Sequence, residues 1–198
     1  MFKYCPHCKS AEITFNGING YQCKKCGWVY YHNVAAAVMA ILVMDKKILF
    51  EIRANEPGKG KLDLPGGFID PGENAEQALK REIKEELNLT ISKFKYIGTA
   101  INEYPYNDII YNTCDIIYYS DLPEIPNTYN SSEVKGVVLK SINKLREEEI
   151  ASKSIVEALK IYNNMSNLDE PESIKSLRRQ FPFNVPAKGG AGAKKLST

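Results

Sequence analysis

Hydrophobic residues in the middle of the chain occur in short runs that polar turns separate. The run from Ala35 to Met44 is followed by a polar triplet at 45–47 and by a second run from Ile48 to Arg53. Two short apolar runs joined by a tight polar turn are typical of two paired, buried strands. Further strands are expected at Ile91–Ala100, Ile109–Tyr119 and Val134–Leu139, which are rich in Ile, Val and Tyr.

Two other segments show the helical spacing of apolar residues. Residues Ala75–Leu87 have this spacing, and Asn74 before them is a residue type that caps helix N-termini. The segment Ser141–Tyr162 returns to helical spacing, and we expect two helices that meet near residues 151–154. Strands that surround one internal helix, with a helix at the end, predict an α/β fold with a mixed sheet in an α/β/α sandwich over residues 34–164.

The two ends of the chain lack this pattern. Residues 1–33 contain two C-x-x-C pairs, and residues 165–198 lose periodicity and end in a Gly- and Lys-rich stretch, which predicts a flexible C-terminal tail. The 198 residues, 43% of them hydrophobic, favour one main domain with a small appendage. Because the sequence has no apolar run long enough to span a membrane and no signal-peptide pattern, we expect a cytoplasmic protein.

The paired cysteines are Cys5, Cys8, Cys23 and Cys26, with fourteen residues between the pairs. Each C-x-x-C turn presents two thiolates on one side, and two such turns close a tetrahedron around Zn²⁺. A piece of this size buries too little apolar surface to fold alone, so the metal would stabilise it. The alternatives are two unrelated thiol pairs or one redox-active pair. A closed four-thiolate site leaves His7 and His32 as surface side chains, and Cys114 is expected to be a buried thiol.

Charge is distributed unevenly along a chain whose formal net charge is only +2. Residues 1–34 and 171–198 carry net charges of +3 and +5, whereas residues 35–170 carry −6. An acidic centre between two basic ends argues against nucleic-acid binding over the whole surface and is compatible with a site for divalent cations.

Three glutamates fall on one side of the helix predicted at 75–87. At 100° per residue, Glu82, Glu85 and Glu86 lie within one sector beside the apolar stripe. Carboxylates this close repel one another, whereas a divalent cation attracts them, and hard oxygen ligands favour Mg²⁺ or Mn²⁺. Gly66 and Gly67 allow a close approach of the backbone, and this pair offers a carbonyl as a further ligand. The alternative is a solvated helix face whose charges pair with lysines.

The fixed positions of this region resemble the Nudix box, G-x5-E-x7-R-E-U-x-E-E-x-G-U, in which U is aliphatic. They are Gly67, Glu73, Arg81, Glu82, Ile83, Glu85, Glu86 and Leu89, with Asn88 where the family has glycine. The resemblance implies the Nudix fold and hydrolysis of a nucleoside diphosphate linked to another group, with Mg²⁺ or Mn²⁺. It also implies that Glu82 and Glu86 bind the metal, that Glu85 is a further ligand or helps to deprotonate the attacking water, and that the Gly66 carbonyl faces the metal. Arg81 and Glu73 would pair and hold the loop against the helix.

The cysteine pairs ahead of the box are similar to the zinc ribbon of the NADH pyrophosphatase branch of this family. In that branch a glutamate after the box also binds metal, and Glu133 occupies the corresponding place here, although Gly136 and Leu139 depart from the branch's pattern. Where the branch has its dinucleotide motif, this chain shares only an aromatic–Pro–aromatic core, in which Tyr104 and Tyr106 would stack on a base or ribose or only pack a loop.

The resemblance therefore implies an enzyme that acts on a nucleotide derivative such as NADH, ADP-ribose or a nucleotide sugar. The alternative is a non-catalytic Nudix-like module that senses a nucleotide, with a ribbon that binds protein or nucleic acid. A ribbon beside a short exposed strand also offers a contact surface for a homodimer.

Overall fold

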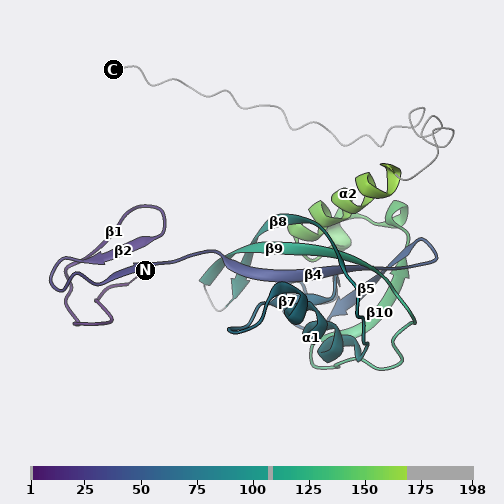
Figure 1. Cartoon of the computed structure of the whole chain (residues 1–198), viewed down its shortest axis with the longest axis horizontal. Helices are drawn as coiled ribbons and strands as arrows, with labels where there is room; N and C mark the ends of the chain where they lie inside the picture. The colour runs from purple at the N-terminus through teal and green to yellow at the C-terminus, as the bar shows by residue number, and fades with distance from the viewer. Residues whose placement is uncertain (1, 107–108, 169–198) are drawn as a thin grey trace, which may run out of the picture. The chain divides into compact units, whose positions relative to one another are not determined.

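The structure is a computed structural model that describes residues 2–106 and 109–168 (Figure 1). Its largest part, here called the central domain, is built on a mixed sheet that begins at Ala35. The strands are β4 (Ala35–Met44), β5 (Lys47–Arg53), β8 (Lys95–Tyr106), β9 (Ile109–Asp121) and β10 (Val134–Lys140), with β6 (Leu62–Asp63) beside β5 and β7 (Gly66–Phe68) beside β4. Among the described residues, no helix is long and apolar enough to cross a membrane.

The long strands follow the order β10-β5-β4-β9-β8. The pairing of β4 with β9 is parallel, from Ala35↔Thr113 to Val43↔Asp121, and the other pairings in this sheet are antiparallel. This order places β4 and β5 in the interior of the sheet, so the apolar runs predicted as buried strands are covered on both faces.

Two helices cover opposite faces of the sheet, namely α1 (Ala75–Leu87) and α2 (Lys153–Leu168) (Figure 1). Alternate residues of β4 divide between two apolar clusters, with Val38 and Leu42 in the cluster on the α1 side and Met39 and Ile41 in the cluster on the α2 side. The period of two in a strand therefore produces one core layer on each face, which is the α/β/α sandwich that the sequence predicts.

Helix α1 has exactly the predicted bounds because both of its ends are capped. Asn74 accepts a hydrogen bond from the backbone of Gln77, and the Gln77 side chain accepts one from the backbone of Asn74, which forms a capping box. At the other end Asn88 adopts the left-handed conformation with φ of 53°. Asparagine tolerates this conformation better than most residues do, which explains why it can replace the glycine of the box.

Two of the expected elements differ from the structure. The strand expected from Ile91 begins only at Lys95, because the buried Ile91 packs against the α1-side core without pairing to a strand. The expected pair of C-terminal helices is wrong: the segment contains the short 3₁₀ turns η1 (Ile142–Lys144) and η2 (Glu147–Glu149), followed by the single helix α2. Helix formation is interrupted near Ile150, whose backbone bridges to Leu62 of β6.

The end of α2 also bears on the expected C-terminal tail. The helix continues to Leu168, past the boundary expected at residue 165, and residues 169–198 lie outside the described part of the chain.

The N-terminal piece is a small antiparallel sheet of β1 (Ile13–Phe15), β2 (Gly20–Cys23) and β3 (Val29–Tyr31). Phe15, Tyr21 and Tyr30 lie in register across the three strands, and Trp28 stacks on Tyr30 with ring centroids 5.8 Å apart. These rings remain partly exposed, so the piece has an aromatic layer but little buried core. Gly27, directly after the second cysteine pair, has a positive φ of 76°, which glycine adopts without strain.

Candidate functional site

The four paired cysteines converge at one end of the N-terminal sheet. Their Sγ atoms all lie within 4.8 Å of one another, with 3.7 Å between those of Cys5 and Cys26 and 3.6 Å between those of Cys8 and Cys23. Four thiolates about 2.3 Å from a central Zn²⁺ would be about 3.8 Å apart, so the spacing matches a tetrahedral four-thiolate site. The cluster is consistent with a zinc ribbon. His7 and His32 are exposed, as expected, whereas Cys114 is only half-buried.

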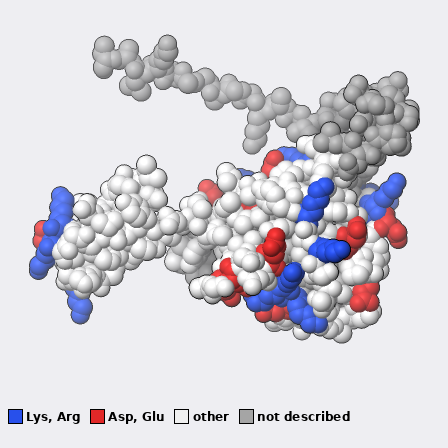
Figure 2. Space-filling model, in the orientation of Figure 1, with Lys and Arg blue, Asp and Glu red and all other residues white. Residues whose placement is uncertain are grey.

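A pocket of about 1230 Å³ opens into the central domain. Residues from β4, β5, β7, β8, β9 and the N-terminal part of α2 line it, together with Glu82 and Glu86 of α1. Figure 2 shows acidic and basic side chains interspersed on the visible face of this domain, with no single basic stripe there. The charge of the pocket lining is different, because carboxylates outnumber basic groups in it.

Six of these carboxylates come from elements far apart in the sequence. They are Glu51 of β5, Asp63 of β6, Glu82 and Glu86 of α1, Asp115 of β9, and Glu133 immediately before β10. The structure therefore brings three of the predicted metal-ligating carboxylates, Glu82, Glu86 and Glu133, into one pocket. Glu133 is exposed, and its carboxylate accepts a hydrogen bond of 3.3 Å from Asn130.

Glu86 is the most deeply placed of the predicted ligands, with 8% of its surface exposed. The backbone N–H of Gly66 donates a hydrogen bond of 2.9 Å to its Oε2. Burial, followed by the nearby charge of Glu51, raises the pKa of Glu86 well above its ordinary value despite this hydrogen bond. Burial also raises the pKa of Glu82, and Arg81 opposes that shift. Both carboxyl groups would therefore be stabilised in their ionised form by a nearby cation.

Arg81 fixes the outer side of the site. Its guanidinium bonds to the Glu73 carboxylate, to Glu82 Oε1 at 2.9 Å, to Glu85 Oε2 at 3.2 Å and to the Phe68 carbonyl at 3.0 Å. The Glu73 carboxylate also accepts the backbone N–H of Asp70, so the loop before α1 is tied to the helix through one side chain. The hydrogen bond from Arg81 lowers the pKa of Glu73 and keeps that group ionised.

The three box glutamates do not occupy equivalent environments. Glu86 is buried and Glu82 is half-buried, whereas the Glu85 side chain is 54% exposed and is not among the residues that line the pocket. The expectation that Glu85 is a further ligand or acts on the attacking water stays a prediction, because in the structure its carboxylate faces Arg81.

Two consecutive glycines allow β7 to pass close to α1. A Cβ on Gly67 would overlap the Glu82 carboxylate, and one on Gly66 would overlap the backbone of β4 at Val38. Gly66 also has a φ of 148°, in the region that favours glycine. The sequence predicts a close approach at this point. The structure identifies what approaches, namely the carboxylate of one predicted metal ligand and the neighbouring strand.

The residues of the pocket fit a hard divalent cation by donor type. Several carboxylates face one cavity with few basic groups, and Oε1 of Glu51 is buried without a hydrogen-bond partner. In the described part of the chain, the four cysteines are the only group of three or more His, Cys, Asp or Glu side chains whose ligand atoms already lie close enough together to hold a metal ion. The carboxylates are therefore more widely spaced than the thiols and would have to draw together around an ion.

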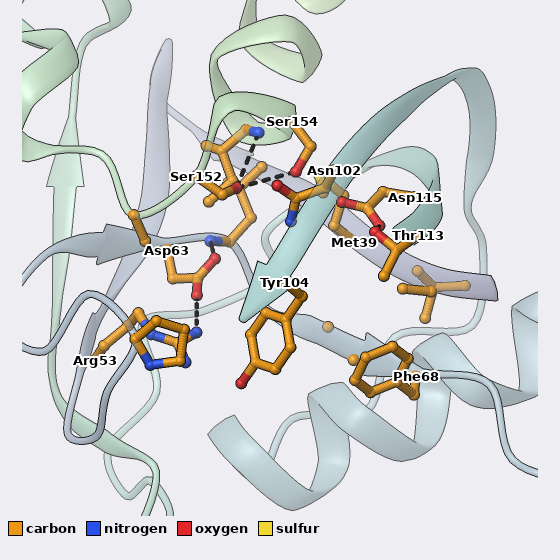
Figure 3. Close-up of a pocket in the computed structure, with 18 of the residues that line it drawn as sticks. Met39, Arg53, Asp63, Phe68, Asn102, Tyr104, Thr113, Asp115, Ser152 and Ser154 are labelled. Atoms are coloured by element: carbon orange, nitrogen blue, oxygen red, sulfur yellow. Dashed lines mark hydrogen bonds and ion pairs between the residues drawn. The ribbon is translucent and has the colours of Figure 1, made fainter. Parts of the chain in front are cut away.

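The pocket also carries aromatic and neutral polar side chains, which lie beside Arg53, Asp63 and Asp115 (Figure 3). Phe68 and Tyr104 meet edge to face with centroids 5.8 Å apart. The buried Thr113 hydroxyl donates a 2.5 Å hydrogen bond to Asp115, and Ser152 and Ser154 share a hydrogen bond at the start of α2. Tyr104 lines the pocket, and its contact with substrate stays a prediction. The side chain of Tyr106, the other predicted contact, lies outside the described part of the chain.

Three acidic residues of this pocket are not among the site residues predicted from the sequence, namely Glu51, Asp63 and Asp115. A signal for two of them exists, since Glu51 is the one acidic residue in the apolar run Ile48–Arg53 and Asp115 interrupts the run Ile109–Tyr119. An ionisable side chain inside a buried strand is seldom found without a partner or a function. Asp63 belongs to a two-residue strand that hydrophobic periodicity does not reveal.

The chain matches one protein family and is similar to named members of it. The family described as "NUDIX domain" matches residues 32–159, more than half of the sequence. An NAD-capped RNA hydrolase, NudC, from Chromobacterium violaceum is 26% identical over 105 residues, which cover 53% of this chain and 39% of that protein. An ADP-ribose pyrophosphatase from Methanocaldococcus jannaschii is 51% identical over 59 residues, covering 30% of this chain and 35% of that protein. The chain thus spans little more than a third of each of these relatives.

Solved structures share the architecture of the central domain. A NUDIX hydrolase from Nitrosomonas europaea aligns with a TM-score of 0.57 and 26% identity, covering 86% of this chain and 95% of that one. A MutT NUDIX hydrolase from Burkholderia pseudomallei aligns with a TM-score of 0.57 at 21% identity, covering 65% of this chain and 98% of that one, and shows the fold alone.

Proposed function

This chain belongs to the Nudix family, and from that membership together with its acidic pocket we propose that it hydrolyses the diphosphate linkage of a nucleoside diphosphate derivative with Mg²⁺ or Mn²⁺. Nudix enzymes are a family of pyrophosphohydrolases, and every carboxylate of the box is present here. The observation that carries the proposal is the meeting of Glu82, Glu86 and Glu133 in one large pocket that also holds an aromatic pair.

Glu82, Glu86 and Glu133 would hold the metal. A divalent cation held there would neutralise the diphosphate, lower the pKa of a bound water and stabilise charge that develops at phosphorus. Support comes from the raised pKa values of Glu82 and Glu86, since a site that is costly for carboxylates alone becomes favourable for them beside a cation.

The protein's own groups orient these ligands. Gly66 N–H fixes one oxygen of Glu86, and Arg81 fixes one oxygen of Glu82, so each carboxylate keeps its other oxygen for the ion. Arg81 also holds the loop through Glu73, which keeps Gly66 and Gly67 against α1. Ligands held this way lose less conformational freedom when they bind, which favours a precise position of the scissile bond.

The aromatic half of the pocket is proposed to receive the nucleoside. The pair Phe68 and Tyr104 offers a surface on which a base stacks, in the same pocket as the carboxylates, which would repel phosphate without a cation. The two named relatives act on NAD-capped RNA and on ADP-ribose, according to their names. NAD contains an ADP-ribose unit, so both names favour an adenosine diphosphate linked through a ribose.

The N-terminal piece, residues 1–33, is proposed to be a structural zinc ribbon that precedes a Nudix domain over residues 34–164. The tetrahedral spacing of the four Sγ atoms supports zinc at this place. A four-thiolate site has no open position, so its contribution is folding energy for a sheet that buries few side chains of its own.

The test is hydrolysis of NADH, ADP-ribose, nucleotide sugars and nucleoside triphosphates in the presence of Mg²⁺ or Mn²⁺. Wild type is compared with Glu86→Gln and with the control Glu157→Gln, which alters an exposed residue of α2 outside the pocket. We expect one substrate class to be turned over, with a loss of more than about 100-fold for Glu86→Gln and none for the control. Nucleotide binding without turnover would refute the hydrolase and favour a sensor.

A further inference from the structure

Glu51 occupies a place where the fold calls for an apolar side chain. It lies on β5 two residues after Leu49, and side chains two apart point to the same face of a strand. That face packs against α1, and Leu49 is completely buried in the α1-side core. The strand neighbour of Glu51 on β10 is Val137, whose side chain joins the same core. A carboxyl group here therefore gives up packing that valine or leucine would provide.

The carboxyl group of Glu51 has no protein partner that explains it. It is 4% exposed, and its Oε1 atom has no hydrogen bond. Arg53, a basic residue on the same strand, forms its ion pair with Asp63 on β6. In the described part of the chain Arg53 forms no ion pair with Glu51, and its Nε atom is itself buried without a partner.

Negative charge surrounds Glu51 on the side of the pocket. Burial together with Asp63 and Glu133 raises the pKa of Glu51 to about 8 against the opposing charge of Arg53, and Glu51 is in turn the strongest charged influence on Glu86. Both residues line the pocket, one from the sheet and one from the helix. Either a proton or a cation must relieve this repulsion, and a pocket open to solvent admits a hydrated cation.

We propose that Glu51 is a ligand of the divalent cation held by Glu86, so that the metal site extends from α1 onto β5. This proposal rests on the proposed function. It adds a ligand from outside the Nudix box, on strand β5, which precedes Gly66 and Gly67 in the chain. The cation would be the missing partner of Oε1, and a hard ion such as Mg²⁺ or Mn²⁺ accepts such an oxygen.

The experiment measures Mn²⁺ binding without substrate, by the electron paramagnetic resonance signal of free Mn²⁺, on the zinc-loaded full chain. The variants are Glu51→Gln, Glu51→Val, Glu86→Gln and Glu103→Gln. Glutamine retains the shape of Glu51, and valine suits the apolar face in case glutamine fails to fold. Glu103 lines the same pocket but is exposed on β8, so its variant controls for the general loss of one negative charge.

We expect both Glu51 variants to bind Mn²⁺ about 10-fold or more weakly than wild type, while Glu103→Gln stays within about 2-fold. Unchanged Mn²⁺ affinity in Glu51→Gln and Glu51→Val overturns the proposal, and so does an equal loss in Glu103→Gln. If Glu86→Gln loses affinity while the Glu51 variants keep it, the inference fails and the proposed function stands. If the folded wild type binds no Mn²⁺, the metal-dependent function itself fails.

Discussion

Replacing Gly67 with alanine would place a methyl group where the Glu82 carboxylate now lies. The added Cβ would be 2.7 Å from Cδ and 3.1 Å from Oε2 of Glu82, whereas ordinary contacts begin at 3.4 Å. The Oε1 atom of Glu82 would lie closest to the new methyl group, so the carboxylate must move by about 1 Å to reach an ordinary contact. It cannot do so freely, because Arg81 holds this Oε1 at 2.9 Å and both side chains are half-buried. Overpacking and the loss of a charged hydrogen bond together give a cost of about 1–3 kcal/mol.

The matched control is Gly136→Ala. Both glycines lie in strands, neither has a φ in the region reserved for glycine, and a Cβ on Gly136 would meet only Ile52 at an ordinary 3.7 Å. Urea unfolding of the metal-free protein, followed by circular dichroism, should show the loss in Gly67→Ala and less than about 0.5 kcal/mol in the control. Affinity for Mn²⁺ should fall in Gly67→Ala alone. Equal stability and equal Mn²⁺ affinity in the two variants would show that Arg81 does not hold Glu82 in place.

Two further predictions concern protons and zinc. Because burial raises the pKa of Glu51 from 4.5 to about 8, the native state keeps a proton that the unfolded state releases between these pH values. The stability of the metal-free protein should therefore fall as pH rises from about 4.5 to about 8. Thermal melts of Glu51→Val should show a smaller fall over this range. The same dependence of melting temperature on pH in wild type and variant would contradict the prediction. Zinc removal by a chelator should shift the emission of Trp28, the sole tryptophan, and Cys8→Ser should match the chelated protein. Emission that is unchanged after measured zinc release would contradict the structural role.

Local sequence signals predict the bounds of those elements whose ends are determined by residues next to them in the chain. Helix α1 has its predicted bounds because Asn74 and Asn88 act on neighbouring backbone groups. Strand β4 has its predicted bounds because its apolar run is long and is followed directly by a turn with positive φ at Asp45 and Lys46. The prediction of two helices after β10 is wrong because the course of that segment depends on a bridge from Ile150 to Leu62, which no local pattern contains.

The same distinction explains which parts of the site the sequence reveals. Glu82 and Glu86 are one helical turn apart, so their common direction follows from periodicity alone. The proximity of Glu51 to Glu86 depends on the place of β5 in the sheet and on the packing of α1 across that face, and neither is encoded near either residue. Strand β5 does carry one local signal. Its period of two places the ionisable side chain of Glu51 on the same buried face as Leu49, where an apolar residue is expected. Fold stability alone would select an apolar residue at that position, so retaining the carboxylate requires a chemical reason, and a cation shared with Glu86 provides one.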